Sequence, residues 1–138
     1  MAAIRSDSAQ VVQTAIYSRL SSALSESVYS APPDAESFPY VIIGLDGIGE
    51  SGDASGRLLE HTIEIRAYSS ARGSLAIKGL CGRILAELTR VELDLSADDY
   101  SAMLVRHLSS DFDVSVNGAK RIFDVTIRLT VTVQDTLL

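Results

Sequence analysis

The chain has few of the residues on which disulfides, metal centres and membrane spans depend. Its 138 residues include no tryptophan, one cysteine and two histidines, and no apolar run approaches the roughly 18 residues of a membrane helix. A single cysteine, Cys81, excludes an internal disulfide and a cysteine-rich zinc site, which is consistent with a reducing compartment. Residues 1–7 lack the apolar core of a signal peptide. We therefore expect a protein that is made in the cytoplasm and neither secreted nor inserted into a membrane.

Basic residues are fewer than acidic ones. Twelve Lys and Arg stand against eighteen Asp and Glu, which gives a net charge of −6. An acidic surface repels the phosphate backbone, so sequence-independent DNA binding is not expected. With 46% hydrophobic and 22% charged residues, the composition is that of one globular domain with a sizeable core, predicted to span 1–138.

The N-terminal part of the chain has the apolar spacing of an amphipathic helix. From Ser6 to about Leu24, apolar residues recur every fourth position, at Val12, Ile16 and Leu20, which places them on one helix face. Ser6 or Asp7 is a fitting N-cap, because a short polar side chain there accepts a hydrogen bond from the first turn. The first element is therefore predicted to be a helix.

The rest of the chain combines extended patterns with a second helical pattern. Alternation or short apolar runs predict strands at 27–30, 40–45, 57–69, 101–109 and 122–134, and a helical period predicts a helix at 74–90 with Ser74 as its cap. Asn117-Gly118 predicts a tight hairpin turn. The order α-β-β-β-α-β-β predicts an α+β fold, with two helices packed on one face of a mainly antiparallel sheet.

The last predicted strand is unusually long. Between Phe123 and Val133 apolar residues alternate with polar ones without interruption, so one face is apolar. At the usual rise per residue, 122–134 would span roughly 40 Å, about twice a typical strand. This strand therefore either bends within its own domain or reaches beyond it.

Two segments are predicted to lack helix or strand structure. Pro32, Pro33 and Pro39 predict a stiff, extended connector, since proline fixes φ and removes a backbone donor. Residues 46–56, rich in glycine, serine and acids, predict a long flexible loop. The sequence of 44–50 has some likeness to a dinucleotide fingerprint, but the third glycine and the helix that would hold the pyrophosphate are missing. No nucleotide or other cofactor is expected.

The residues that could perform chemistry are few, and their settings argue against it. Cys81 falls on the apolar stripe of the second predicted helix, where a thiol is buried and inert. His61 and His107 lack a third ligand at metal-binding spacing, and the adjacent Asp98 and Asp99 point in divergent directions. We expect no catalytic or metal site. The alternative from another class is a small cytosolic ligand-binding or hydrolytic α+β domain that uses His61, His107 or Cys81.

Several segments, taken in order, match the pattern of one family. They are a leading helix over 11–20, Val28-Tyr29 before Ala31-Pro32-Pro33, the segment 38–44, a strand ending in Arg66-Ala67-Tyr68-Ser69, a helix that starts at Gly73-Ser74, and a closing strand over 121–128. In this arrangement the chain resembles the small tail-completion proteins of long-tailed, siphovirus-like phages and gene transfer agents, which include tail terminators. The likeness covers almost the whole chain. One departure is at 65–69, where many members have a tryptophan and this chain has none.

The resemblance implies a structural protein and not an enzyme. It implies a tail terminator, a homo-oligomeric and hexameric ring that caps the finished tail tube, ends its polymerisation and joins it to the head. The implied partners are further copies of the chain, the tail-tube protein and a head–tail connector or stopper protein, with DNA passing through the ring without specific binding. The implied location is the tail or neck of the virion, after assembly in the bacterial cytoplasm. A head–tail connector or another neck protein is the alternative within this class.

Physical arguments from the residues point to the same kind of assembly. A long edge strand with an apolar face invites aggregation unless a neighbour covers it, and ring closure covers it in every subunit. A long loop at 46–56 is suited to contact a neighbouring subunit. The alternative is a loop that only faces solvent and makes no contact. We expect a subunit or tube interface at Asp46, Glu50, Asp53, Arg57, Arg66 and Arg128. Glu50 and Asp53 are also candidate lumen acids, which would repel the passing DNA.

Overall fold

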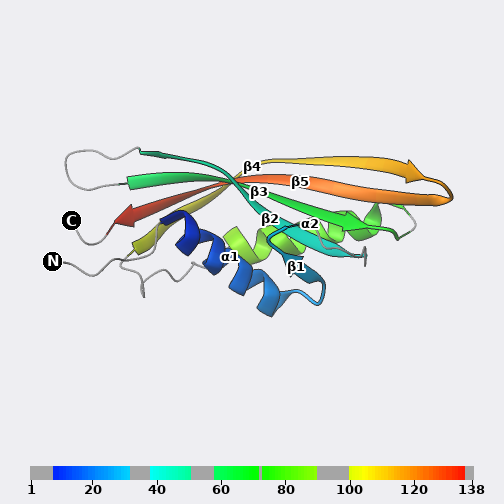
Figure 1. Ribbon diagram of the computed structural model, residues 1–138, viewed down its shortest axis with the longest axis horizontal. Coiled ribbons are helices and arrows are strands. Elements are labelled where there is room, and N and C mark those ends of the chain that lie inside the picture. The colour runs from blue at the N-terminus through cyan, green and yellow to red at the C-terminus, as the bar shows by residue number, and fades with distance from the viewer. Residues whose placement is uncertain (1–7, 32–37, 51–57, 72, 90–99, 136–138) are drawn as a thin grey trace.

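The computed structural model describes residues 8–31, 38–50, 58–71, 73–89 and 100–135. Within them the chain forms two helices and five strands, in the predicted order α-β-β-β-α-β-β. The elements are α1 (Ser8–Ala23), β1 (Ser27–Tyr29), β2 (Tyr40–Glu50), β3 (Leu58–Ser69), α2 (Leu75–Thr89), β4 (Tyr100–Asn117) and β5 (Lys120–Asp135). Both helices lie on the same face of the sheet, below it in Figure 1, which confirms the predicted α+β arrangement. Neither described helix has the length and apolar character needed to cross a membrane.

The sheet is mainly antiparallel, as predicted. Its strand order is β1-β2-β3-β5-β4, and β1 pairs with β2 in parallel while the other neighbouring strands are antiparallel. The described sheet therefore ends in two very different edges, because β1 has three residues and β4 has eighteen. We refer to the two faces as the helix side, covered by α1 and α2, and the open face.

The core forms where the alternating strands meet the two helical stripes. On β5 the side chains from Val125 to Val133 that point to the helix side are fully buried, at Val125, Ile127, Leu129, Val131 and Val133. On the helices the buried set includes Val12, Ile16 and Leu20 of α1 and Ile77, Leu80, Cys81, Ile84 and Leu88 of α2. Burial of this many aliphatic side chains between two layers is the main stabilising term of such a fold. The apolar spacing in the sequence therefore identified the core correctly.

The β4–β5 hairpin is longer than predicted. β4 continues from the predicted 101–109 to Asn117, and its partners on β5 continue in register to Asn117 opposite Lys120. The predicted turn is confirmed, since Gly118 has φ +63°, a conformation that favours glycine. Figure 1 shows the end of this hairpin reaching past both helices. The long last strand therefore runs past the helix-covered part of its own sheet, and its reach beyond the domain stays a prediction.

The predicted loop over 46–56 was wrong in its first part. β2 runs to Glu50, and after a bulge at Asp46 its residues Gly47 to Glu50 pair with Thr62 to Leu59 of β3. Glycine and acids are poor strand formers by themselves, but the regular backbone of β3 supplies the ladder of hydrogen bonds that they join. The remainder of that loop lies outside the described residues, as do Ser6, Asp7, the Pro32-Pro33 pair and the Asp98-Asp99 linker.

Candidate assembly surfaces

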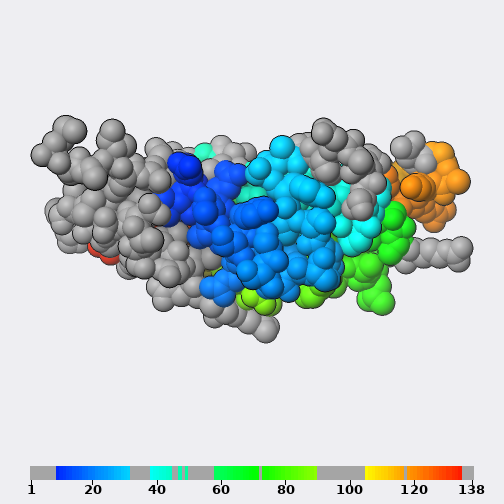
Figure 2. Space-filling model, turned by 60° about the horizontal axis from the view of Figure 1, so that its bottom comes forward, coloured from blue at the N-terminus to red at the C-terminus, as the bar shows by residue number. Residues whose placement is uncertain are grey.

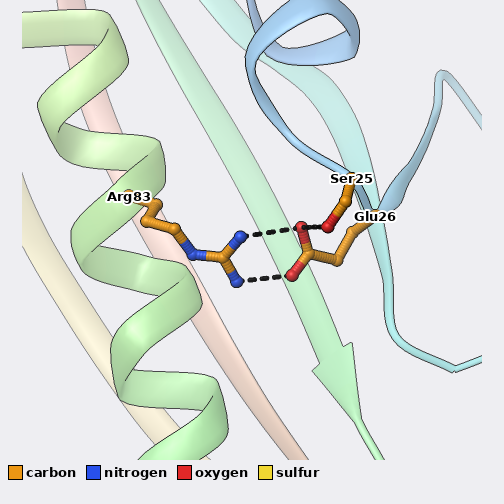
Figure 3. Close-up of polar contacts among 3 residues, drawn as sticks. All are labelled: Ser25, Glu26 and Arg83. Atoms are coloured by element: carbon orange, nitrogen blue, oxygen red, sulfur yellow. Dashed lines mark hydrogen bonds and ion pairs between the residues drawn. The ribbon is translucent and has the colours of Figure 1, made fainter.

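An ion pair connects α2 to the turn between α1 and β1 (Figure 3). The Arg83 guanidinium donates from Nη1 to Glu26 Oε1 at 2.9 Å and from Nη2 to Oε2, and Ser25 Oγ donates to Oε1 at 3.2 Å. The hydrogen bonds from Arg83 lower the pKa of Glu26, and the carboxylate in turn raises the pKa of Arg83. Two parallel N–H···O bonds give this contact geometric specificity as well as energy. The pair therefore fixes the position of α2 against the β1 edge of the molecule.

A groove lies beside this ion pair, between α2, the residues after β3 and the start of β2. Its volume is about 480 Å³, and Glu26 and Arg83 form part of its wall. The rest of the lining is largely small or apolar, including Pro39, Ala71, Leu75, Ala76, Gly79 and Leu80. Leu75 is 83% exposed, although leucine is among the residue types most often buried. We call this feature the α2 groove.

Arg66 and Arg128, two of the six predicted interface residues, lie close together on the open face. Arg66 Nε donates to Glu64 Oε1 at 3.0 Å, and that hydrogen bond raises the pKa of the Arg66 guanidinium. Glu64 is in turn the register partner of Arg128 on β5. Both arginines are exposed, so one carboxylate lies among two cations on a surface that no described helix covers. Such a mixed-charge site suits a polar, salt-sensitive contact.

The other four predicted interface residues are not brought to this site by the described structure. Asp46 lies at the β2 bulge, and Glu50 is opposite Leu59, near the start of β3. Leu59 is seven residues from Arg66 along β3, which is about 24 Å at the rise of a strand. Asp53 and Arg57 lie outside the described residues. Glu50 therefore belongs to the opposite end of the sheet from Arg66.

The open face also carries an aromatic cluster that sequence reasoning missed. The Tyr40 ring stacks on Tyr68 at 4.9 Å between centroids, and Phe38 and Tyr29 lie 5.3 and 6.2 Å from it. Tyr40 is buried although it lies on the face away from the helices. The neighbouring aromatic rings shield Tyr40 from solvent, as a helix would on the other face. The burial of Tyr40 on the open face thus has a local cause.

A pair of acids continues the same row across the sheet. Asp124 of β5 lies between Tyr68 of β3 and Asp113 of β4, in register with both. Partial burial and then the charge of Asp113 raise the pKa of Asp124, and Arg66 opposes this shift. Like charges directly opposite each other are unfavourable in a sheet. The alternation at 111–116 indicates that Asp111 and Asp113 share one face of β4, whereas the pairing of Asp113 with Asp124 depends on the register of the hairpin.

The three side chains considered for catalysis are not arranged for it. Cys81 is buried on the helix side, as the sequence predicted, and His61 is buried there as well. A bulge at Leu108 puts His107 and Ser110 on the same side of β4, with His107 Nε2 2.7 Å from Ser110 Oγ, and Cys81 Sγ donates to the same oxygen at 3.6 Å. Among the described residues no carboxylate orients His107, and no group of three ligands could hold a metal. A nucleophile and base without an orienting group make weak catalytic machinery.

Apolar side chains are exposed on the part of the hairpin that extends past the helices. Phe112, Val114 and Val116 of β4 are 45%, 47% and 70% exposed. Their register partners on β5 are Val125, Phe123 and Arg121, which places all three on the helix side. We call these three residues the hairpin stripe. Figure 2 shows the hairpin, in orange, at one end of the molecule, beyond the surface that α1 forms.

Comparison with known proteins gives one family and one related fold. The profile of the family described as Tail completion protein gp17 matches residues 14–133. A solved structure titled "Virion of native gene transfer agent (GTA) particle" contains a chain that superposes with a TM-score of 0.69 at 22% sequence identity, over 90% of this chain and 96% of that chain. At this identity the likeness shows a shared fold. A search of curated protein sequences found no match.

Proposed function

Because the chain belongs to the Tail completion protein gp17 family, we propose that it is a structural component of a phage or gene-transfer-agent tail and that it acts as the tail terminator. In this role several copies, six in the proposed assembly, form a ring on the end of the tail tube. The ring ends tube polymerisation and presents a surface to the head connector. The chain carries out no reaction.

The observation that carries this proposal is the family match over residues 14–133. The two unlike edges of the described sheet also support it, because β4 offers a long row of backbone groups along which no described strand pairs. An edge of this kind is a template for contact with another chain. Closing copies into a ring satisfies it in each subunit without leaving one edge exposed.

In this proposal each predicted interface residue contacts a partner or faces the lumen of the ring. Arg66 and Arg128, with Glu64 between them, form a mixed-charge patch for a partner on the open face. Asp46 lies at the bulge within β2, Glu50 ends that strand, and Asp53 and Arg57 follow it in the sequence. In the proposal Glu50 and Asp53 face the lumen, and the net charge of −6 keeps the passing DNA from binding.

The test is to measure the mass of the purified protein by light scattering coupled to size exclusion, across a concentration series and with the tail-tube protein added. The expected result is a six-fold mass, or a monomer that becomes a ring on the tube. A second readout is the length of tubes assembled in vitro, which the protein should stop from growing. A chain that stays monomeric with the tube protein and leaves tube length unchanged would overturn the proposal.

A further inference from the structure

The exposure of the hairpin stripe follows from where α2 begins. Lys78, in the first turn of α2, reaches the stripe with its Nζ 5.9 Å from the centroid of the Phe112 ring. Beyond Phe112 the exposed fraction rises from 47% at Val114 to 70% at Val116. The stripe therefore continues the apolar face of the core past the last described element that covers it.

An apolar stripe at this position is a liability for an isolated chain. It lies on β4, an edge strand of the described sheet, so apolar side chains and unpaired backbone groups are offered together. The three residues occupy alternate positions, while Asp111, Asp113 and Ser115 point to the open face. This regular alternation is the pattern of a strand with one buried face. An occupant from another chain would complete it.

The α2 groove has matching properties at the other side of α2. It is apolar on much of its wall and holds the highly exposed Leu75, and its volume of about 480 Å³ lies within the roughly 300–1,000 Å³ typical of sites that enclose an apolar ligand. It lies toward the short β1 edge, since its lining includes Glu26 and Pro39, which directly precede β1 and β2. The chain thus carries an apolar projection toward one sheet edge and an apolar recess toward the other.

We propose that the hairpin stripe of one copy docks into the α2 groove of a second copy. The distribution of charge supports a second copy of this chain as the partner whose hairpin occupies the groove. The tip of the hairpin is basic, with Lys120 and Arg121 both exposed, whereas the whole chain carries −6. The groove wall itself is balanced, because its Arg83 binds its Glu26. A basic tip that approaches an acidic copy is attracted to it.

The geometry of this contact determines the kind of assembly. The stripe and the groove are different surfaces, so the contact is head-to-tail and repeats from copy to copy. Repetition gives a closed ring or an open filament, whereas a contact of hairpin with hairpin would stop at a dimer. This inference rests on the proposed ring, and it assigns the surfaces that build it.

The first experiment compares matched variants of the full chain by light scattering coupled to size exclusion, with the tail-tube protein present. Val114→Asp puts one negative charge on the stripe, and Ser115→Asp puts the same charge on the neighbouring position of the open face. Gly79→Leu fills the groove, and Gly82→Leu makes the same change on α2 outside the groove lining; a Cβ at either glycine meets no atom within 4 Å. Self-association should weaken by about 30-fold or more in the stripe and groove variants, the effect of losing one central interface contact.

The control variants should keep the mass of the wild-type chain. If the stripe and groove variants also keep it, the docking is wrong while the ring proposal stands. If the wild-type chain itself is monomeric with the tube protein, the proposed function fails, so the two failures are distinguishable. Gly79→Leu keeps the test valid if the charged hairpin does not fold, because leucine raises helix propensity at that position.

A second experiment identifies the surfaces directly. In a Cys81→Ala background, one variant carries Val116→Cys and another carries Leu75→Cys. Oxidation of the mixed variants should give a disulfide-linked dimer of the two kinds of chain, in a yield at least several-fold above that of either variant alone. A dimer that forms with Val116→Cys alone would show hairpin contacting hairpin, and it would overturn the head-to-tail docking.

Discussion

Arg83 of α2 binds the Glu26 carboxylate with both of its terminal nitrogens across 57 residues of sequence. The Glu26 side chain is 10% exposed and that of Arg83 is 51% exposed. This contact sets the distance between α2 and the β1 edge, and so it also shapes the α2 groove. A surface ion pair usually contributes little, but a bidentate pair with one partly buried partner is more specific. Its effect on both stability and docking is measurable.

Glu26→Gln is expected to lower the free energy of unfolding at pH 7 by about 1 kcal/mol or less, because Arg83 is half exposed and solvent screens the pair. For a chain of this length that is a fall in Tm of at most about 4 °C. Thermal unfolding followed by circular dichroism checks it, with Glu60→Gln as a control that removes the same charge from an exposed strand position. Equal Tm values for Glu26→Gln and the wild type at pH 7 would contradict the prediction.

The same pair predicts a specific pH dependence. Arg83 lowers the pKa of Glu26 below its ordinary value of 4.5, so the unfolded chain takes up the proton first. The stabilisation is therefore complete above pH 4.5, falls as the pH drops below that value, and is lost once the pH passes the folded pKa. The difference in Tm between the wild type and Glu26→Gln should shrink over this window. A difference that stays constant from pH 7 to pH 3 would rule out the assigned cause.

Asp124→Asn is expected to stabilise the protein at pH 7. Partial burial and the charge of Asp113 raise the pKa of Asp124, so its ionised form disfavours the folded state. That penalty is absent below the unfolded pKa and appears as the pH rises through the folded pKa. The gain should be a few tenths of a kcal/mol, the scale of a like-charge cross-strand pair. Asp111→Asn is the control, because its register partner is Thr126 and not an acid; the same gain in both variants would contradict the pairwise cause.

Cys81 is expected to react with a thiol reagent only when the protein unfolds. The thiol is buried on the sheet-facing side of α2 and donates to Ser110 Oγ, and reactive cysteines need polar, partly exposed sites. In the native protein, a chromogenic disulfide reagent should label Cys81 at the rate of opening measured by hydrogen exchange. Labelling within seconds under native conditions would instead favour the hydrolytic alternative.

The sequence predicted burial best within single helices and strands, where buried and exposed positions alternate with a regular period. The alternation in β3 and β5 and the helical stripe of α2 depend on near neighbours in the chain, so periodicity alone gave their buried faces. β2 from Gly47 to Glu50 is a strand because β3 lies beside it, and the distal half of β4 is one because β5 does. Composition cannot supply a partner strand, which is why both segments were missed.

The candidate surfaces were predictable only in part for the same reason. That Arg66 and Arg128 point to one face follows from alternation, but the carboxylate of Glu64 between them follows from the strand order β3-β5. Contacts between distant elements had no sequence signal at all. Neither the pairing of Glu26 with Arg83 nor the exposure of the hairpin stripe could be read from spacing, because each depends on where α2 lies on the sheet.

Arg128→Ala is expected to weaken binding to the tail-tube protein or to neighbouring copies while leaving the fold intact. Arg128 is exposed, and its removal also takes away a cation opposite Glu64, so the free energy of unfolding should change by no more than about 0.5 kcal/mol. Binding by the wild type should weaken more with added salt than binding by Arg128→Ala, since exposed charges are screened within roughly 8 Å at physiological ionic strength. Binding measured at low and high salt checks this, with Thr130→Ala, two residues along the same face, as the control. If Arg128→Ala binds as the wild type does at both salt concentrations, the open face is outside the interface, and assembly depends on the helix side alone.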